Sequence, residues 1–377
     1  MGTATATTYR AEHVGSLLRP PELLQARRDH QQGRLTMEQL RAIEDRAARD
    51  AIQLQREAGI EVFTDGEVRR ANWMSELLET VGGVVPVEQP TGTGWHRDGE
   101  PDPDPEETRF QLVAAREKVS RKLLLSRVEA DFLAQHAPGR FKITMMSSSM
   151  GGMLWNPQIT AATYPTPGDL VRDLVDLQVQ EIEDLVDHGV DWLQLDSLSY
   201  MQIIDQQFSE FLKSSGVNIA EGLDLAVSVD NTLARAAKAK NPEVTVGLHF
   251  CRGNNRSAWA ARGGYEPVAE RLFGGVDVDR FLLEYDTDRA GGFEPLRFVP
   301  GGKTVVLGLV SSKVPQLESI DDLRRRIDEA SRHVPLENLA LSPQCGFAST
   351  APGNLLTVDE ERRKLELVVE TARKVWG

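Results

Sequence analysis

Three runs of the chain, TVGLHFC at 245–251, RFLLEYD at 280–286 and TVVLGLV at 304–310, decide the fold. Each is short, mostly apolar and rich in β-branched or aromatic side chains, which is the pattern of a strand buried on both faces of a parallel sheet. Working outward from them, five further runs of the same kind appear at 11–18, 61–67, 142–146, 192–196 and 339–345. Three and five make eight predicted strands.

Amphipathic helical stretches follow most of these runs, at 36–58, 170–188, 223–240, 320–333 and 358–375. A parallel connection needs a crossover of helical size, so strands that alternate with helices indicate a parallel sheet. Eight such units favour an α/β fold with a single (β/α)8 barrel spanning 1–377. An open doubly wound sheet is the alternative, but no G-x-G-x-x-G motif follows the first run. We therefore favour the barrel.

One segment, VPVEQPTGTGWHRDGEPDPDPEE at 85–107, interrupts the alternation because it is rich in Pro, Gly and Asp. A long connection in a compact domain is either a solvated surface excursion or a functional element such as a lid or an oligomer contact. We expect a structured surface hairpin or loop inserted into the barrel, and we assign it no chemistry.

Composition narrows the class of protein. Lys and Arg number 43 against 57 Asp and Glu, a net charge of −14, which argues against a nucleic-acid or anionic-membrane partner. No apolar run reaches the roughly 20 residues that cross a bilayer, and the first residues, MGTATATTYR, lack the apolar core of a signal peptide. Only two cysteines are present, so a disulfide scaffold is excluded and we expect a cytoplasmic enzyme.

In such a barrel, catalytic side chains stand at the carboxyl ends of the strands. The polar residues there are Ser16, Asp65, Glu67, Asp196, His249, Cys251, Glu284, Ser311, Lys313 and Cys345. His249 and Cys251 project from the same face of one strand, and barrel closure brings Cys345 close to them. One imidazole and two thiolates suit Zn²⁺ and leave a fourth position open for chemistry. The alternative is that all three are ordinary core residues.

Other strand-end residues indicate how a substrate is held. Glu67 and Asp196 are carboxylates that can orient a substrate ammonium or hydroxyl, or can instead pair with arginines such as Arg69 and Arg70. Arg252 follows the metal pair directly and can bind either an anionic substrate group or an acidic residue of its own loop. The residues alone leave these alternatives open.

Five motifs resemble, in the right order, the catalytic half of cobalamin-independent methionine synthase and its single-barrel relatives: EHVGSLLRP at 12–20, TDGEVRR at 64–70, HFCRGN at 249–254, LLEYD at 282–286 and SPQCGF at 342–347. The resemblance implies zinc held by His249, Cys251 and Cys345, with Glu284 as a further, displaceable ligand. It also implies that zinc activates a thiol, which is homocysteine in methionine synthase, for attack on the methyl group of methyl-tetrahydrofolate. By the same match, the residues that hold the amino-acid end of homocysteine are Ser16, Glu67 and Asp196.

Departures from that family point to a changed substrate. The additional N-terminal barrel of the full-length synthase is absent, the acidic pair expected after the fourth strand reads Asp196-Ser197, and the segment MMSSSMGGMLWNP at 145–157 also differs. Among the single-barrel relatives, epoxyalkane:coenzyme M transferase fits such a change, since it opens an epoxide with a zinc-activated thiol. The sulfonate of coenzyme M would then need a cation, for which Arg252 and Arg19 are the candidates.

The sequence therefore predicts a zinc-dependent S-alkyltransferase that takes a small thiol and an alkyl donor, without a nucleic-acid or membrane partner. We favour epoxide opening with coenzyme M, and the alternative is methyl transfer to homocysteine. A zinc-hydroxide hydrolase or lyase and a non-catalytic zinc protein are the remaining classes. We also expect a homo-oligomer.

Overall fold

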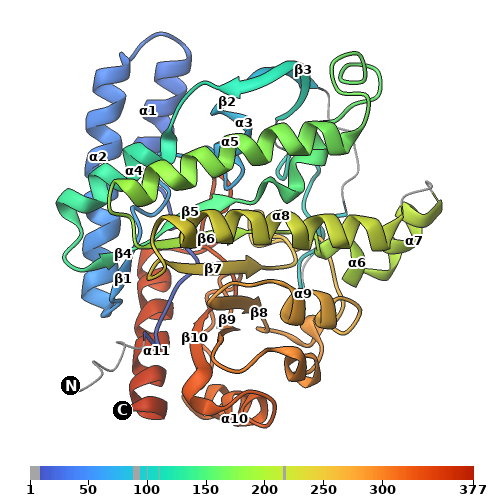
Figure 1. Cartoon of the computed structure of the whole chain (residues 1–377). Coiled ribbons are helices and arrows are strands. Elements are labelled where there is room, and N and C mark those ends of the chain that lie inside the picture. Colours follow the sequence, from blue (N-terminus) through green and yellow to red (C-terminus); the bar gives the residue numbers. More distant parts are fainter. Residues whose placement is uncertain (1–8, 88–93, 100, 110, 215–217) are drawn as a thin grey trace.

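The computed structural model describes residues 9–87, 94–99, 101–109, 111–214 and 218–377. Its centre is a six-stranded parallel sheet in the order β10-β9-β8-β7-β6-β5 (Figure 1). These strands are β5 (Ile143–Met146), β6 (Trp192–Asp196), β7 (Thr245–Phe250), β8 (Arg280–Glu284), β9 (Thr304–Val310) and β10 (Leu339–Pro343). A second parallel pair consists of β1 (Val62–Phe63) and β4 (Arg140–Phe141). Every residue of β6 and β8 is buried, as expected for strands covered on both faces.

Two further positions close this sheet into a barrel. β4 leads into β5 through Lys142, so its partner β1 stands beside the sheet. The first described segment pairs with β10 through a parallel bridge between Ala11 and Leu341. The same segment meets the chain after β1, where Leu17 N–H donates to Gly66 O at 3.0 Å. Seven of the eight predicted runs contain a strand, whereas the run at 11–18 is irregular except for the bridge at Ala11. The predicted α/β barrel is confirmed.

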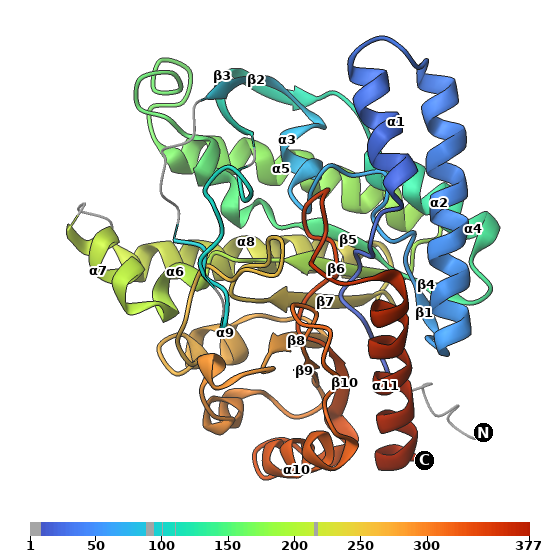
Figure 2. The same cartoon turned by 180° about the vertical axis from the view of Figure 1, so that it is seen from behind.

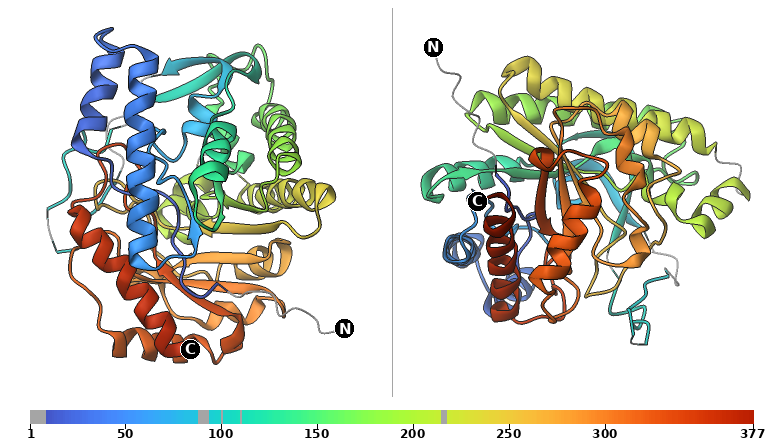
Figure 3. Two further views of the ribbon diagram at one scale, coloured as in Figure 1. Left: turned by 90° about the vertical axis from the view of Figure 1, so that its left-hand side faces the viewer. Right: turned by 90° about the horizontal axis from the view of Figure 1, so that it is seen from below.

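Helices cover the outside of the barrel. They are α1 (Pro21–Gln31), α2 (Met37–Ala58), α3 (Ser75–Leu78), α4 (Leu125–His136), α5 (Pro167–Asp187), α6 (Met201–Ile204), α7 (Gln206–Ser214), α8 (Ile219–Lys240), α9 (Ala269–Gly275), α10 (Ile320–Ala330) and α11 (Val358–Trp376), with short 3₁₀ turns at Ser148–Leu154, Asp288–Ala290, Glu294–Phe298 and Leu336–Asn338. α5 and α8 lie side by side (Figure 1), and α2 packs beside α11 (Figure 3). Within the described residues, no helix has the length and apolar character that crossing a bilayer requires.

The starts of the long helices follow from local sequence. α2, α5 and α11 each begin after a threonine whose side chain accepts the N–H of the third helical residue, while the side chain of that residue accepts the threonine N–H. This reciprocal capping satisfies two backbone donors that the helix itself leaves unpaired. The capped ends explain why these helices begin close to their predicted positions.

Alternate strand residues face the interior of the barrel. Toward the amino ends of the strands, Glu12 is fully buried and accepts hydrogen bonds from Lys142 Nζ at 3.0 Å and Arg280 Nη2 at 2.7 Å. Burial raises the pKa of Glu12, but these two cations outweigh it and lower the value to about 2. A separate apolar cluster consists of Leu282, Val306 and Ala340. Ion pairs and apolar packing fill this part of the interior, so the carboxyl ends of the strands are the place to look for chemistry.

The excursion begins as the hairpin that we expected. β2 (Val81–Val87) pairs antiparallel with β3 (Leu112–Arg121), and part of the connection, at 88–93 and 100, lies outside the described residues. Figure 2 shows the teal connection beside the loops that follow β7 and β8. His96 exchanges two backbone hydrogen bonds with Trp259, at 2.8 and 2.9 Å. The excursion therefore packs on the barrel at the end where the candidate site lies.

Candidate metal centre and active site

Three predicted ligands converge at the carboxyl end of the barrel. His249 lies near the end of β7, Cys251 follows that strand directly, and Cys345 follows β10. All three are buried, and their ligand atoms lie within 4.8 Å of one another. The two sulfur atoms are 3.8 Å apart, and both cysteines are free thiols. We call these three residues the Cys-His cluster.

His249 offers a nitrogen lone pair to this cluster. Its Nδ1 lies 3.3 Å from Leu282 O, so a proton on Nδ1 can be donated to that carbonyl while Nε2 keeps its lone pair. Nε2 is buried and has no hydrogen-bond partner within the described residues. An unpartnered imidazole nitrogen beside two sulfur atoms fits the ligand set that Zn²⁺ prefers.

Cys345 is the thiol of the cluster that ionises more readily. The hydrogen bond between the two thiols and the nearby imidazole hold the pKa of Cys345 well below its ordinary range, although burial opposes them. Ser349 Oγ lies 3.6 Å from Cys345 Sγ and accepts a hydrogen bond from Asn254 Nδ2 at 3.0 Å. That bond leaves the Ser349 proton free to point at the sulfur. We missed Ser349 in the sequence because it lies in an irregular loop without a periodic signal.

Glu284 lies beside the Cys-His cluster, but its carboxylate is not among the ligand atoms that lie within 4.8 Å of one another. It is fully buried. Its Oε2 accepts the Arg252 backbone N–H at 2.9 Å, and its Oε1 accepts Arg289 Nη2 at 3.0 Å. In this conformation both carboxylate oxygens therefore have protein partners, and ligation of a metal by Glu284 stays a prediction.

Glu67 is held in a strained backbone conformation. Its φ of 54° lies in the left-handed region, which a residue with a Cβ atom adopts at an energetic cost. Arg19 Nη2 donates to Glu67 O at 2.9 Å, and Glu67 N–H donates to Asp65 Oδ1 at 2.8 Å. The side chain is buried, and its Oε1 accepts a hydrogen bond from Thr144 Oγ1 at 2.8 Å. These contacts fix the orientation of the Glu67 carboxylate.

Asp196 is the second predicted carboxylate. Burial raises its pKa to about 7, and the charge of Glu67 adds to the effect, which indicates that the two carboxylates lie close enough to interact. Asp196 Oδ1 accepts Gln194 Nε2 at 2.9 Å. The alternative role of Glu67, an ion pair with Arg70, is present at 3.9 Å, although Arg70 makes a shorter bond, of 2.7 Å, to Glu129. Glu67 and Asp196 thus form a negative pair at the barrel mouth.

Ser16 lies against the loop that carries Cys345. Phe347 N–H donates to Ser16 O at 2.9 Å. A Cβ atom added to Gly346 would lie 2.0 Å from Ser16 Oγ. Glycine at this position therefore makes room for the serine side chain beside the Cys-His cluster.

The two arginines predicted to bind an anionic substrate group already have acceptors in the protein. Arg252 is fully buried and its Nη2 donates to Gly263 O at 2.7 Å. Arg19 donates to Ala348 O at 2.8 Å and to Glu67 O. Both guanidinium groups brace loops around the site, and anion binding by either stays a prediction that requires these acceptors to be displaced.

The Asp196-Ser197 departure has a structural counterpart. Ser197 Oγ donates to Asp230 Oδ2 at 3.0 Å, and Tyr200 OH donates to the same oxygen at 2.6 Å. Asp230 is fully buried in α8, and burial raises its pKa to about 6. Ser149 Oγ lies 3.1 Å from Ser197 Oγ. A hydroxyl network anchored by a carboxylate of α8 therefore lies next to Asp196, and we did not anticipate it.

The excursion contacts the site through one arginine. Asp98 Oδ2 accepts Arg289 Nη1 at 2.7 Å, and Arg289 in turn donates to Glu284. Asp98 Oδ1 also accepts Trp259 Nε1 at 2.9 Å. We expected no chemistry from this segment, and the structure shows that it touches the partner of a candidate metal ligand.

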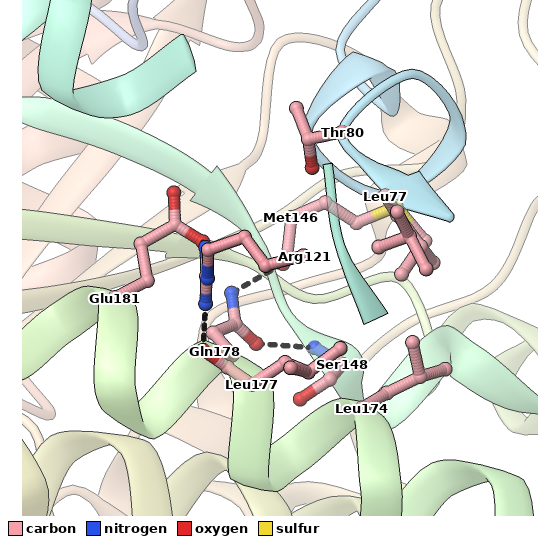
Figure 4. Close-up of a pocket in the computed structure, with 10 residues that line it drawn as sticks. Leu77, Thr80, Arg121, Met146, Ser148, Leu174, Leu177, Gln178 and Glu181 are labelled. Atoms are coloured by element: carbon pink, nitrogen blue, oxygen red, sulfur yellow. Dashed lines mark hydrogen bonds and ion pairs between the residues drawn. The ribbon is translucent and has the colours of Figure 1, made fainter. Parts of the chain in front are cut away.

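Figure 4 shows a pocket outside the Cys-His cluster, lined by residues from α3, β2, β3, β5 and α5. Gln178 Nε2 donates to Met146 O at 2.8 Å, and Arg121 pairs with Glu181 at 2.7 Å. None of the three cluster residues lines this pocket, and its volume is about 30 Å³. A cavity of that size holds only a few water molecules, so it is not a substrate site.

Comparison with known proteins identifies the family. Residues 145–374 match the family described as "Cobalamin-independent synthase, Catalytic domain". The chain is 36% identical to the uncharacterized protein YxjH of Bacillus subtilis, over 98% of this chain and 95% of that protein. A solved structure from Listeria monocytogenes, provisionally assigned as a vitamin-B12-independent methionine synthase, is 27% identical with a TM-score of 0.70, covering 98% of this chain and 99% of that one. A B12-independent methionine synthase from Shewanella sp. W3-18-1, in complex with selenomethionine, gives a TM-score of 0.69 at 18% identity, covering 98% of both chains.

The chain belongs to the cobalamin-independent methionine synthase catalytic-domain family, and the resemblance drawn from its motifs is confirmed at that level. It is an enzyme of a methyltransferase family. The likeness to the Shewanella protein, at 18% identity, shows the fold alone. The proteins named above include no epoxyalkane:coenzyme M transferase, so that finer assignment finds no support among them.

Proposed function

We propose that this enzyme transfers a methyl group to the sulfur of homocysteine at a zinc ion held by His249, Cys251 and Cys345. The observation that carries the proposal is the Cys-His cluster, in which two sulfur atoms and an unpartnered imidazole nitrogen lie within 4.8 Å of one another. Membership in a methyltransferase family supports it. Three protein ligands leave a position for a fourth, exchangeable one.

Zinc bound there would lower the pKa of a coordinated thiol and so supply a thiolate nucleophile. The chain's own residues orient the acceptor. Glu67 and Asp196 form the negative pair that suits the ammonium group of an amino-acid thiol. Ser16 offers a hydroxyl beside the Cys-His cluster. The Ser349 hydroxyl, 3.6 Å from Cys345 Sγ, can donate to that sulfur and so orient it as a ligand.

Epoxide opening with coenzyme M is the second candidate. The hydroxyl network of Ser197 and Asp230 favours it, since it marks a changed pocket wall. Two observations favour methyl transfer instead. Glu67 and Asp196 repel a sulfonate, and the arginines predicted for that sulfonate, Arg19 and Arg252, donate to protein carbonyls. The family comparison also supports methyl transfer better than epoxide opening.

A paired product assay tests the proposal. Zinc-loaded enzyme is incubated in one tube with homocysteine and methyl-tetrahydrofolate, and in another with coenzyme M and epoxypropane, and products are identified by mass spectrometry. We expect methionine in the first tube alone. A hydroxypropyl thioether in the second tube alone would replace methyl transfer by the second candidate.

Thiol activation is tested apart from the alkyl donor. A thiol that binds the metal releases its proton at neutral pH, so homocysteine should acidify a weakly buffered solution of the zinc-loaded enzyme. Cys251→Ser should abolish the release, and His188→Ala, which changes an exposed histidine, should not. Absence of release with every small thiol would contradict thiol activation.

The carboxylate role is tested with two thiols. Glu67→Gln should impair binding of homocysteine far more than binding of 2-mercaptoethanesulfonate, because the sulfonate thiol carries no ammonium group. Equal losses would refute an ammonium-binding role for Glu67.

A further inference from the structure

The strand register places Glu284 next to the Cys-His cluster. β8 pairs in parallel with β7, with Leu283 opposite Phe250, and the residues that come next are Glu284 and Cys251. The Oε2 atom of Glu284 accepts the N–H of Arg252, the residue that follows Cys251, at 2.9 Å. The carboxylate is therefore hydrogen-bonded to the backbone immediately after a predicted metal ligand.

The Glu284 carboxylate has to move before it can ligate a metal held by the cluster. It is not among the ligand atoms that lie within 4.8 Å of one another. Two donors to one zinc ion are at most about 4.6 Å apart, which is twice a long zinc–ligand bond of about 2.3 Å. Ligation by Glu284 therefore requires a side-chain position other than the one in the structure.

Arg289 opposes that movement. Its Nη2 donates to Glu284 Oε1 at 3.0 Å, and its Nη1 donates to Asp98 Oδ2 at 2.7 Å. The guanidinium lies over the ring of Trp259, 5.0 Å from the ring centroid. The Arg289 side chain is 5% exposed and that of Glu284 is fully buried. A charge-assisted hydrogen bond shielded from water is strong, so separating Glu284 from Arg289 costs free energy.

The contacts that hold Arg289 come from irregular segments. Asp98 belongs to the excursion, and its Oδ1 accepts Trp259 Nε1 at 2.9 Å. The same aspartate therefore fixes both the guanidinium and the ring beneath it. Asp98 lies outside the span of 145–374 that matches the family. The restraint on Glu284 thus depends on a part of this chain that the family match does not cover.

We propose that Arg289 is a positioning residue that holds Glu284 away from a metal bound by the Cys-His cluster, and so leaves the fourth metal position open to the acceptor thiol. The inference rests on the proposed function, because it concerns the position that the thiol would take. Without Arg289, the freed carboxylate would compete with the thiol for that position. Arg289 therefore favours an open metal site over one closed by a fourth protein ligand.

Zinc affinity in a double-mutant cycle of Arg289→Met and Glu284→Gln tests the inference. In a chelator competition, Arg289→Met should raise the affinity by about 10- to 100-fold, the range for a charge-assisted hydrogen bond, because the freed Glu284 becomes a ligand. In the Glu284→Gln background the same change should raise the affinity far less, since only the charge of Arg289 is removed. Arg289→Lys should stay close to the wild type. The control is Arg297→Met, which changes an exposed arginine paired with Glu266 and should have no effect.

Co²⁺ in place of zinc reports on the fourth ligand. The visible spectrum of the Co²⁺-loaded protein depends on its ligand set, and a bound thiol adds a sulfur-to-cobalt charge-transfer band. The spectrum of Arg289→Met without thiol should differ from that of the wild type. Titration with 1-propanethiol should show binding to Arg289→Met that is weaker by about 10-fold or more. Arg289→Gln serves as a second neutral variant if the methionine variant does not fold.

The outcomes separate the inference from the proposed function. Unchanged zinc affinity in Arg289→Met would overturn the inference, and so would equal gains in both backgrounds, because Arg289 would then act through its charge alone. A changed cobalt spectrum in Glu284→Gln alone would also overturn it, since Glu284 would already be a ligand in the wild type. A metal-loaded wild type that binds no thiol would overturn the proposed function, whereas the coupling between Arg289 and Glu284 in zinc affinity would still decide whether Arg289 holds the carboxylate away.

Discussion

Replacing Glu361 by glutamine tests how a buried carboxyl group that joins the last helix to the segment at 11–18 affects stability. Glu361 lies in α11 and is 1% exposed. Its Oε1 accepts the N–H of Leu18 at 2.9 Å, which ties the last helix to the first strand segment. No cation among the described residues pairs with this carboxyl, so burial dominates and raises its pKa to about 8.

The sign and size of the effect follow from that pKa. In the unfolded chain the carboxyl ionises near pH 4.5, so between that pH and about 8 the unfolded state has lost the proton that the folded state keeps. The free energy of unfolding therefore falls as the pH rises through this window. Each tenfold change in the ionisation constant is worth about 1.4 kcal/mol, which gives a loss of about 3 kcal/mol by pH 7 and about 5 kcal/mol by pH 9.

Glutamine stays neutral at every pH, and its carbonyl oxygen can still accept the Leu18 N–H. Glu361→Gln should therefore gain stability over the wild type as the pH rises, by roughly the amounts above, measured from their difference at pH 4. Urea unfolding followed by circular dichroism at pH 4, 7 and 9 measures this difference. Burial also raises the pKa values of Asp196 and Glu129 to about 7. Both residues are present in the variant and in the wild type, so their contributions cancel in the difference of the two unfolding free energies.

The matched control is Glu370→Gln, which changes an exposed carboxylate of the same helix. It removes an exposed ion pair with Lys374, so it should change the free energy of unfolding by less than about 1 kcal/mol at each of the three pH values. A stability difference between Glu361→Gln and the wild type that is the same at all three pH values would refute the reasoning, because the buried carboxyl would then not be the titrating group.

Three further changes test the site. Gly346→Ala places a Cβ atom 2.0 Å from Ser16 Oγ, so it should displace that hydroxyl and lower kcat/KM, and unchanged kinetics would contradict the crowding. Ser349→Ala removes the hydroxyl 3.6 Å from Cys345 Sγ; it should weaken zinc about 10-fold or more in a chelator competition, and equal affinity would remove its role. Asp98→Asn removes the carboxylate that links the excursion to the barrel, so hydrogen exchange at 94–99 should speed up while the barrel core keeps its protection, and unaltered exchange would contradict the docking.

The strands could be predicted because burial on both faces leaves few polar residues between their ends. The run at 192–196 coincides with β6, and that at 304–310 with β9. The run at 61–67 is regular only at Val62–Phe63. The chain turns soon afterwards, where Gly66 and Glu67 have φ values of 75° and 54°, so the polar remainder of that run, at 64–67, serves the site rather than the sheet.

Side-chain partners far apart in the chain leave no periodic signal, and this limited prediction of the site. The Cys-His cluster could be anticipated because strand ends converge in any closed barrel. The partner of Glu284 could not be anticipated, because Arg289 lies in the irregular loop after β8. The second acceptor of Arg289 is Asp98, which lies in the excursion. Arg252 and Arg19 were predicted to bind an anionic substrate group and carry the right charge for it. Both guanidinium groups, however, already donate to backbone carbonyls of irregular loops.

The first strand segment joins these observations to the pH argument. Leu18 is tied to α11 by Glu361, and the next residue, Arg19, donates to the carbonyl of Glu67, whose left-handed backbone needs such support. Ser16, two residues before Leu18, accepts the N–H of Phe347 with its backbone carbonyl oxygen, and Phe347 lies in the loop that carries Cys345. Above pH 8 the native state must bury a charge at Glu361, and local opening that hydrates this charge becomes easier. Because the same short segment positions Glu67, binding of an amino-acid thiol should weaken over this pH range before the barrel unfolds, and Glu361→Gln should remove that weakening.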